Sequence, residues 1–100
     1  MYYRISISRV QQDDSGIFIW DTMVNQIDLE LSISLYFQLM NLDSFDYQSS
    51  WVTFRITKSD ILNLEYEYFN QDDFEFIRLL YSVLDMGFVV GVDMFVHPAL

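Results

Sequence analysis

The segment from Glu65 to Phe76, with the sequence EYEYFNQDDFEF, concentrates residue types that recognise other molecules. Five carboxylates and five aromatic side chains interleave within its twelve residues. Carboxylates bind arginine and lysine through charge-assisted hydrogen bonds, and aromatic rings stack on guanidinium groups or enter apolar pockets. The composition therefore predicts a surface for a basic partner. Its expected members in this segment are Glu65, Glu67, Asp72, Asp73 and Glu75.

The composition of the same segment can also be explained by the fold alone. If its first part is a strand, Tyr66 and Tyr68 face the core while Glu65 and Glu67 face water. Asp72 then serves as the N-cap of a helix, and the neighbouring acids complete its first turn. Under this explanation the charge contributes only capping and solubility.

A second acidic and aromatic group lies in the polar stretch 43–50. Loops commonly display interaction residues, so we expect Asp43, Asp46 and Tyr47 to contribute to partner binding. The alternative is an ordinary turn built from Asp and Ser.

Few residues of this chain are suited to catalysis. It contains no cysteine and one histidine, His97, close to the end of the sequence, so a nucleophile would lack its usual base. Asp93, inside an apolar run, is the one candidate for a carboxylate with a raised pKa, unless it pairs with an arginine across the sheet. The acidic pairs at 13–14 and 72–73 lack the spacing of an EF-hand. We expect no enzyme activity, no metal and no cofactor.

Charge and composition limit the class of protein. The 100 residues include 15 acids and 5 bases, for a net charge of −10. This excludes a nucleic-acid binder that works by phosphate neutralisation. A content of 52% hydrophobic and 18% aromatic residues excludes a disordered acidic chain. We expect a single domain over residues 1–100.

Targeting and membrane signals are not evident in the sequence. The first residues, MYYRISISRV, lack the apolar run of a signal peptide, and no stretch approaches the ~20 apolar residues of a membrane span. The expected location is cytoplasmic.

Hydrophobic periodicity predicts seven elements. Alternation around Ile5 and Ile7 indicates a strand, and a turn at 11–16 leads to a second strand. The stretch 22–42 fits a helix better than a strand by its length, although its residues 22–35 also alternate. The expected strands are 4–8, 17–20, 52–57, 62–68 and 88–96, and the expected helices are 22–42 and 72–86.

Two of these strands, 52–57 and 62–68, are expected to form a hairpin with Phe54 opposite Leu64. The last helix begins with Asp72 as N-cap and ends before Gly87 in a left-handed conformation. The order β-β-α-β-β-α-β predicts an α+β fold, with an antiparallel or mixed sheet and two helices packed on one face.

These properties suggest a small acidic inhibitor that blocks a basic, nucleic-acid-processing target. The preferred form is an immunity protein that neutralises a toxin nuclease, because such enzymes bind phosphate with basic surfaces. One alternative is a phage antidefence protein, similar to an anti-CRISPR, that mimics nucleic-acid charge. Another is a non-catalytic homodimer with an assembly role, since a domain of this size cannot easily bury 18 aromatic side chains.

Overall fold

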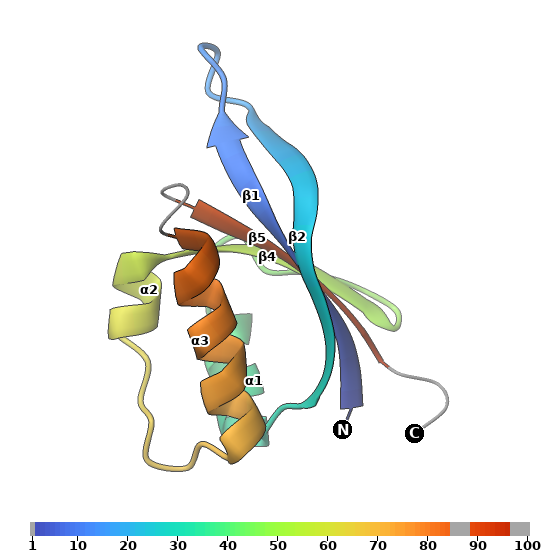
Figure 1. The fold of residues 1–100 in the computed structure, drawn as a ribbon, viewed down its shortest axis with the longest axis vertical. Helices are drawn as coiled ribbons and strands as arrows, with labels where there is room; N and C mark the ends of the chain where they lie inside the picture. The colour runs from blue at the N-terminus through green and yellow to red at the C-terminus, as the bar shows by residue number, and fades with distance from the viewer. Residues whose placement is uncertain (1, 85–88, 97–100) are drawn as a thin grey trace.

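The computed structural model describes residues 2–84 and 89–96 (Figure 1). The expected helix end near residue 86, the turn at Gly87 and the position of His97 lie outside the described residues. The strands are β1 (Tyr2–Gln12), β2 (Phe18–Glu30), β3 (Asp46–Gln48), β4 (Trp51–Thr57) and β5 (Val89–Val96). The helices are α1 (Ile33–Met40), α2 (Lys58–Leu62) and α3 (Gln71–Leu84).

The five strands form one sheet in the order β2-β1-β5-β4-β3, and every neighbouring pair is antiparallel. Figure 1 shows all three helices on one side of this sheet. The α+β class and the packing of helices on one face are confirmed, with α2 as a helix additional to the two expected. Antiparallel pairing of all strands allows the opposite face of the sheet to lie open.

The core lies between the sheet and the helices. Alternate residues of the three central strands are buried toward the helices, as period-2 patterning requires. In β4 these are Val52, Phe54 and Ile56. In α3 the buried residues Phe76, Leu80 and Val83 follow helical spacing and cover them. The core also contains Ile5, Ile7, Val90, Val92 and Met94 from β1 and β5.

The expected helix over 22–42 is wrong in its first half. Strand β2 continues to Glu30 because it pairs along its length with β1, from Gln12 opposite Phe18 to Tyr2 opposite Glu30. The alternation of apolar and polar residues, which is compatible with a strand in 22–35, is therefore a better indicator here than the length of the segment. Helix α1 begins only after Ser32, whose hydroxyl accepts a hydrogen bond from the Leu35 N–H at 3.1 Å.

The expected strand at 62–68 is also wrong. After β4 the chain turns into α2, because Thr57 and Asp60 form a capping box in which each side chain bonds the other's backbone N–H. Phe54 pairs with Val92 rather than with Leu64. The hairpin partner of β4 is β3 on its other side, joined through Ser49 in the left-handed region at φ 59°.

Candidate partner-binding surface

The loop of residues 63–70 carries the first half of the acidic and aromatic segment and connects α2 to α3. It is anchored on α1 by one side chain, Gln38. The Gln38 amide donates to the Glu65 carbonyl at 2.9 Å, and its oxygen accepts from the Glu65 N–H at 2.7 Å. This paired bond holds the backbone of the loop at Glu65.

Aromatic packing holds the rest of the loop. Tyr66 lies 5.3 Å from Phe69 and 6.3 Å from Phe74 between ring centroids, and the latter two rings are 5.8 Å apart. The Tyr66 hydroxyl donates to the Ile61 carbonyl at 2.8 Å. Burial raises the pKa of this phenol above its usual value of 10.0. The three rings form a small cluster that joins the main core through Phe69.

The loop displays the remaining side chains to solvent. Glu65 and Glu67 are exposed, and Tyr68 is 74% exposed. A loop that is already ordered loses less conformational entropy when it binds a partner. Residues 65–68 are therefore a pre-organised acidic and aromatic surface, which we name the acidic loop.

Asp73 has a different role from the one expected for it. It is completely buried, and its two oxygens accept from the backbone N–H groups of Ser32 and Asn70, each at 2.9 Å. The Asn70 side chain in turn accepts from the Asp73 N–H at 2.7 Å. The capping box of α3 thus joins Asn70 to Asp73, and Asp72 is not the N-cap. A carboxylate buried in this way cannot touch a partner.

Asp72 and Glu75 are also engaged within the chain. Asp72 accepts from the Glu30 N–H at 2.8 Å, and Asn70 donates its amide to the Glu30 carbonyl at 3.0 Å. Together with Asp73, these bonds attach the start of α3 to the turn between β2 and α1. Glu75 pairs with Arg78 one turn later, and the hydrogen bond from that guanidinium lowers the pKa of Glu75.

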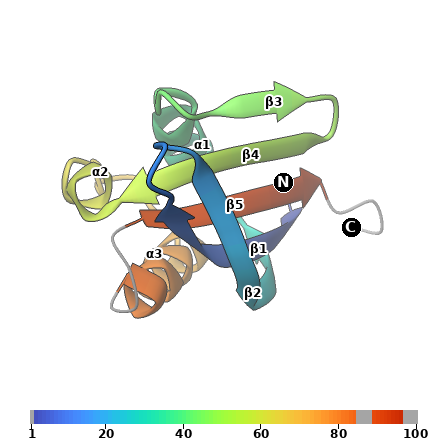
Figure 2. The ribbon, with the colours of Figure 1, turned by 90° about the horizontal axis from the view of Figure 1, so that it is seen from above.

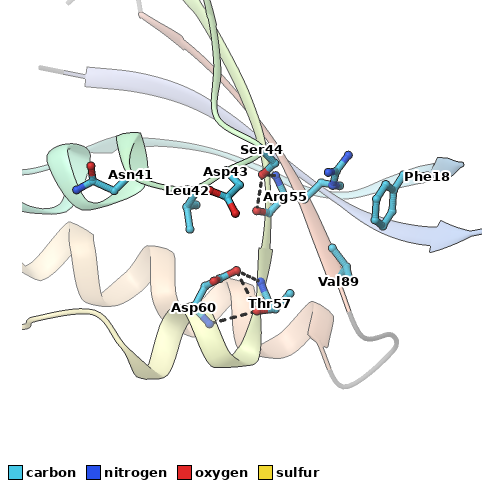
Figure 3. Close-up of a pocket in the computed structure, with 9 residues that line it drawn as sticks. All are labelled: Phe18, Asn41, Leu42, Asp43, Ser44, Arg55, Thr57, Asp60 and Val89. Atoms are coloured by element: carbon cyan, nitrogen blue, oxygen red, sulfur yellow. Dashed lines mark hydrogen bonds between the residues drawn. The ribbon is translucent and has the colours of Figure 1, made fainter. Parts of the chain in front are cut away.

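The second predicted group separates into different environments. Asp43 is exposed and lines a pocket of about 360 Å³ with Arg55 and Asp60 (Figure 3). Asp60 is held there by its bonds to Thr57, while Arg55 turns away, with its guanidinium 3.8 Å from the centre of the Phe18 ring.

Asp46 and Tyr47 point to opposite faces of β3. Tyr47 is 64% exposed and lines a hollow of about 510 Å³ with Tyr3 and Tyr36. Burial is the main cause that raises the pKa of both Tyr3 and Tyr36. Asp46 lies in register with Thr53, on the face of the sheet away from the helices.

The structure does not gather the eight predicted residues into one patch. Figure 2 shows β3 at one edge of the sheet, whereas the acidic loop follows α2 on the helical side. Gln38, which orders the loop, was not singled out from the sequence, because the two bonded residues are 27 positions apart. No short-range pattern signals such a contact.

Acidic residues outnumber basic ones by 15 to 5, so the chain carries an excess of negative charge. The ion pairs among the described side chains include Arg4–Asp28 and Glu75–Arg78. No group of three or more carboxylates or histidines suited to a metal gathers in residues 2–84 and 89–96. Within the same ranges, no helix has the length and apolar character to cross a membrane.

No family model, no curated protein and no solved structure matches this chain. The fold and the surface together define an acidic α+β domain with an ordered acidic and aromatic loop on its helical side.

Proposed function

We propose that this protein is a non-catalytic inhibitor that docks on a basic protein surface, in the first instance an immunity protein that blocks a toxin nuclease. The observation that carries the proposal is the acidic loop, in which exposed Glu65, Glu67 and Tyr68 are held by a backbone anchored to Gln38. Enzymes that bind nucleic acid present arginine and lysine at their active sites. An ordered acidic surface complements such a site directly.

The net charge of −10 supports the same proposal through kinetics. Complementary charge accelerates the encounter of two proteins and makes it sensitive to salt. Tyr68 supplies a rigid, amphipathic anchor of the kind that contributes strongly at interface centres. The net charge then governs the rate of encounter, and the aromatic side chain governs the stability of the complex.

A phage antidefence protein is the closest alternative. It would use the same carboxylates in place of nucleic-acid phosphates and would block a nuclease or a guide-loaded complex. A homodimer is favoured by a separate feature, the exposed stripe of Ile33, Phe37 and Met40 along α1. The inhibitor remains the preferred function because the acidic loop is both ordered and charged.

The test compares how much basic protein three immobilised baits retain at low salt. The baits are the native protein, Glu67→Lys and Asp14→Lys. Glu67→Lys reverses a charge in the acidic loop, and Asp14→Lys reverses an exposed charge in the β1–β2 turn as a matched control. We expect the native protein and Asp14→Lys to retain a basic protein that is released at about 0.5 M salt. Glu67→Lys should retain at least tenfold less of it.

The retained protein is then purified and assayed for nuclease activity. Inhibition by the native chain, relieved by Glu67→Lys, supports the proposal. A salt-resistant dimer in size-exclusion chromatography with light scattering, together with no basic protein on any bait, would overturn it.

A further inference from the structure

The face of the sheet away from the helices, here called the open face, carries a polar row across five strands. Asp46 of β3 is in register with Thr53 of β4, which is in register with Asp93 of β5. The row continues through Ser6 of β1 to Gln26 of β2. Its two carboxylates are separated by one strand, so their backbones lie about 10 Å apart, with Thr53 between them.

Two tryptophans border this row. Trp20 and Trp51 line a hollow of about 420 Å³ together with Asp46, Thr53 and Asp93. The hollow therefore has indole walls, a threonine floor and carboxylates from two strands. It lies on the opposite side of the sheet from the acidic loop.

Both indoles are braced by their neighbours. A Cβ at residue 91 would lie 2.7 Å from the Trp20 ring, so this ring rests directly on Gly91. In the view of Figure 2, β2 crosses in front of β5, the strand that carries Gly91. Trp51 stacks on Phe95 with ring centroids 5.7 Å apart and an angle of 3°. The walls of the hollow are thus in place before any ligand binds.

The charge within the hollow is negative. Arg55 also lines the hollow, but Figure 3 shows its side chain directed toward Phe18, on which its guanidinium is stacked, so two carboxylates face one cation that is already engaged. The ion pairs among the described side chains involve neither Asp46 nor Asp93. Asp93 is half-buried, which strengthens its interaction with a cation relative to one in bulk water.

We propose that this hollow binds the guanidinium group of an arginine side chain on a partner protein. Guanidinium is a planar cation that stacks on the face of an aromatic ring and donates paired hydrogen bonds to carboxylates, and this hollow offers both groups. Lysine, a compact point charge, would use the acids but would not stack on an indole face as a planar guanidinium does. The proposal shares with the proposed function a basic protein as partner, and it assigns a second contact on another face.

Intrinsic fluorescence tests the site without a known partner, because Trp20 and Trp51 are the only tryptophans of the chain. The probe is the peptide acetyl-Gly-Arg-Gly-amide, and its control carries citrulline, the neutral isostere of arginine. We expect a saturable change of fluorescence with the arginine peptide, at least fivefold weaker binding of the lysine peptide, and no saturation with citrulline. Equal responses to the arginine and citrulline peptides would overturn the proposal.

Variants locate the binding on the open face. Asp93→Asn and Asp46→Asn keep the side-chain shape, and each should weaken binding of the arginine peptide at least fivefold, whereas Asp14→Asn, at an exposed carboxylate in the β1–β2 turn, should not. Asp46 is exposed and lies on the edge strand β3, so we expect Asp46→Asn to fold. It therefore tests the site even if Asp93→Asn does not fold. Unchanged binding of the arginine peptide to Asp46→Asn would overturn the proposed site. A fluorescence change when the protein alone is diluted would indicate self-association, and it would also overturn the site.

The two proposals fail separately. If no bait retained a basic protein while the arginine peptide still bound, only the proposed function would fail. If the baits retained the basic protein but the fluorescence did not respond to the arginine peptide, the inhibitor proposal would stand and the arginine site would be wrong.

Discussion

Residues 65–68 and residues 70–73 are neighbours in the chain and both combine acids with polar or aromatic side chains, yet they have opposite roles. In the acidic loop, Glu65 and Glu67 face solvent on a backbone held by Gln38. At the start of α3, Asp72 and Asp73 accept hydrogen bonds from backbone N–H groups far away in sequence. The first pair is open to a partner, and the second pair organises the fold.

The difference follows from where unpaired backbone donors lie. The first turn of a helix leaves N–H groups that need acceptors, and the turn between β2 and α1 presents two more at Glu30 and Ser32. Asp72 and Asp73 lie where they satisfy these donors. Glu65 and Glu67 lie in a loop whose backbone is already bonded through Gln38, so their carboxylates stay in water. Acidic composition alone therefore does not identify a binding surface.

Removal of the Asp73 carboxylate should have the largest effect on stability. Asp73→Ala removes the acceptor of two part-buried N–H groups, at about 1–3 kcal/mol each, so we expect a loss of about 3 kcal/mol in the free energy of unfolding. Urea denaturation followed by circular dichroism measures it.

Asp72→Ala is the matched control for this substitution. It removes one hydrogen bond near the surface and should cost about 1 kcal/mol. If the two variants proved equally stable, the structural role assigned to Asp73 would be wrong.

Release of the acidic loop should have a smaller effect. Gln38→Ala removes both hydrogen bonds to Glu65 and should cost about 1–2 kcal/mol, and amide exchange at Glu65 should become faster. Hydrogen exchange measured by NMR reports both changes. Gln48→Ala, at an exposed glutamine of β3, is the control and should leave Glu65 protected. Slow exchange at Glu65 in Gln38→Ala would show that the loop is ordered by other contacts.

The ion pair of Glu75 should have the smallest effect, and it depends on pH. Arg78 lowers the pKa of Glu75 below its ordinary value of 4.5, so the pair contributes stability above that value and loses it as the pH falls through the folded-state pKa. Glu75→Gln should therefore flatten the decline of stability below about pH 5. Glu67→Gln should leave the decline as it is, and a series of denaturation curves from neutral to acidic pH compares the two.

Local patterns predicted several parts of the fold correctly. Alternation located β1 and β4, and a nearly continuous apolar run located β5. The apolar positions that located α3 are Phe74, Ile77, Tyr81 and Leu84, flanked by Phe76, Leu80 and Val83. These elements bury one face against a single core, so their periodicity is visible in the sequence. The stretch 62–68 alternates equally well, but the capping box of Thr57 and Asp60 starts a helix there and removes the chain from the sheet.

The candidate site was predictable only in part. The sequence singled out Glu65 and Glu67, and the structure exposes both. It also singled out Asp73, which is buried. The hollow between Trp20 and Trp51 joins residues from four strands, and no pattern within one segment marks it.

By itself, the sequence determined the charge of −10, the apolar fraction that makes a core possible, and the α+β class. The tertiary structure alone decided which carboxylates remain available to a partner. The physical reason is that a carboxylate's role depends on the donors around it, and here those donors are contributed by segments about 40 residues away, as in the bond from Ser32 to Asp73.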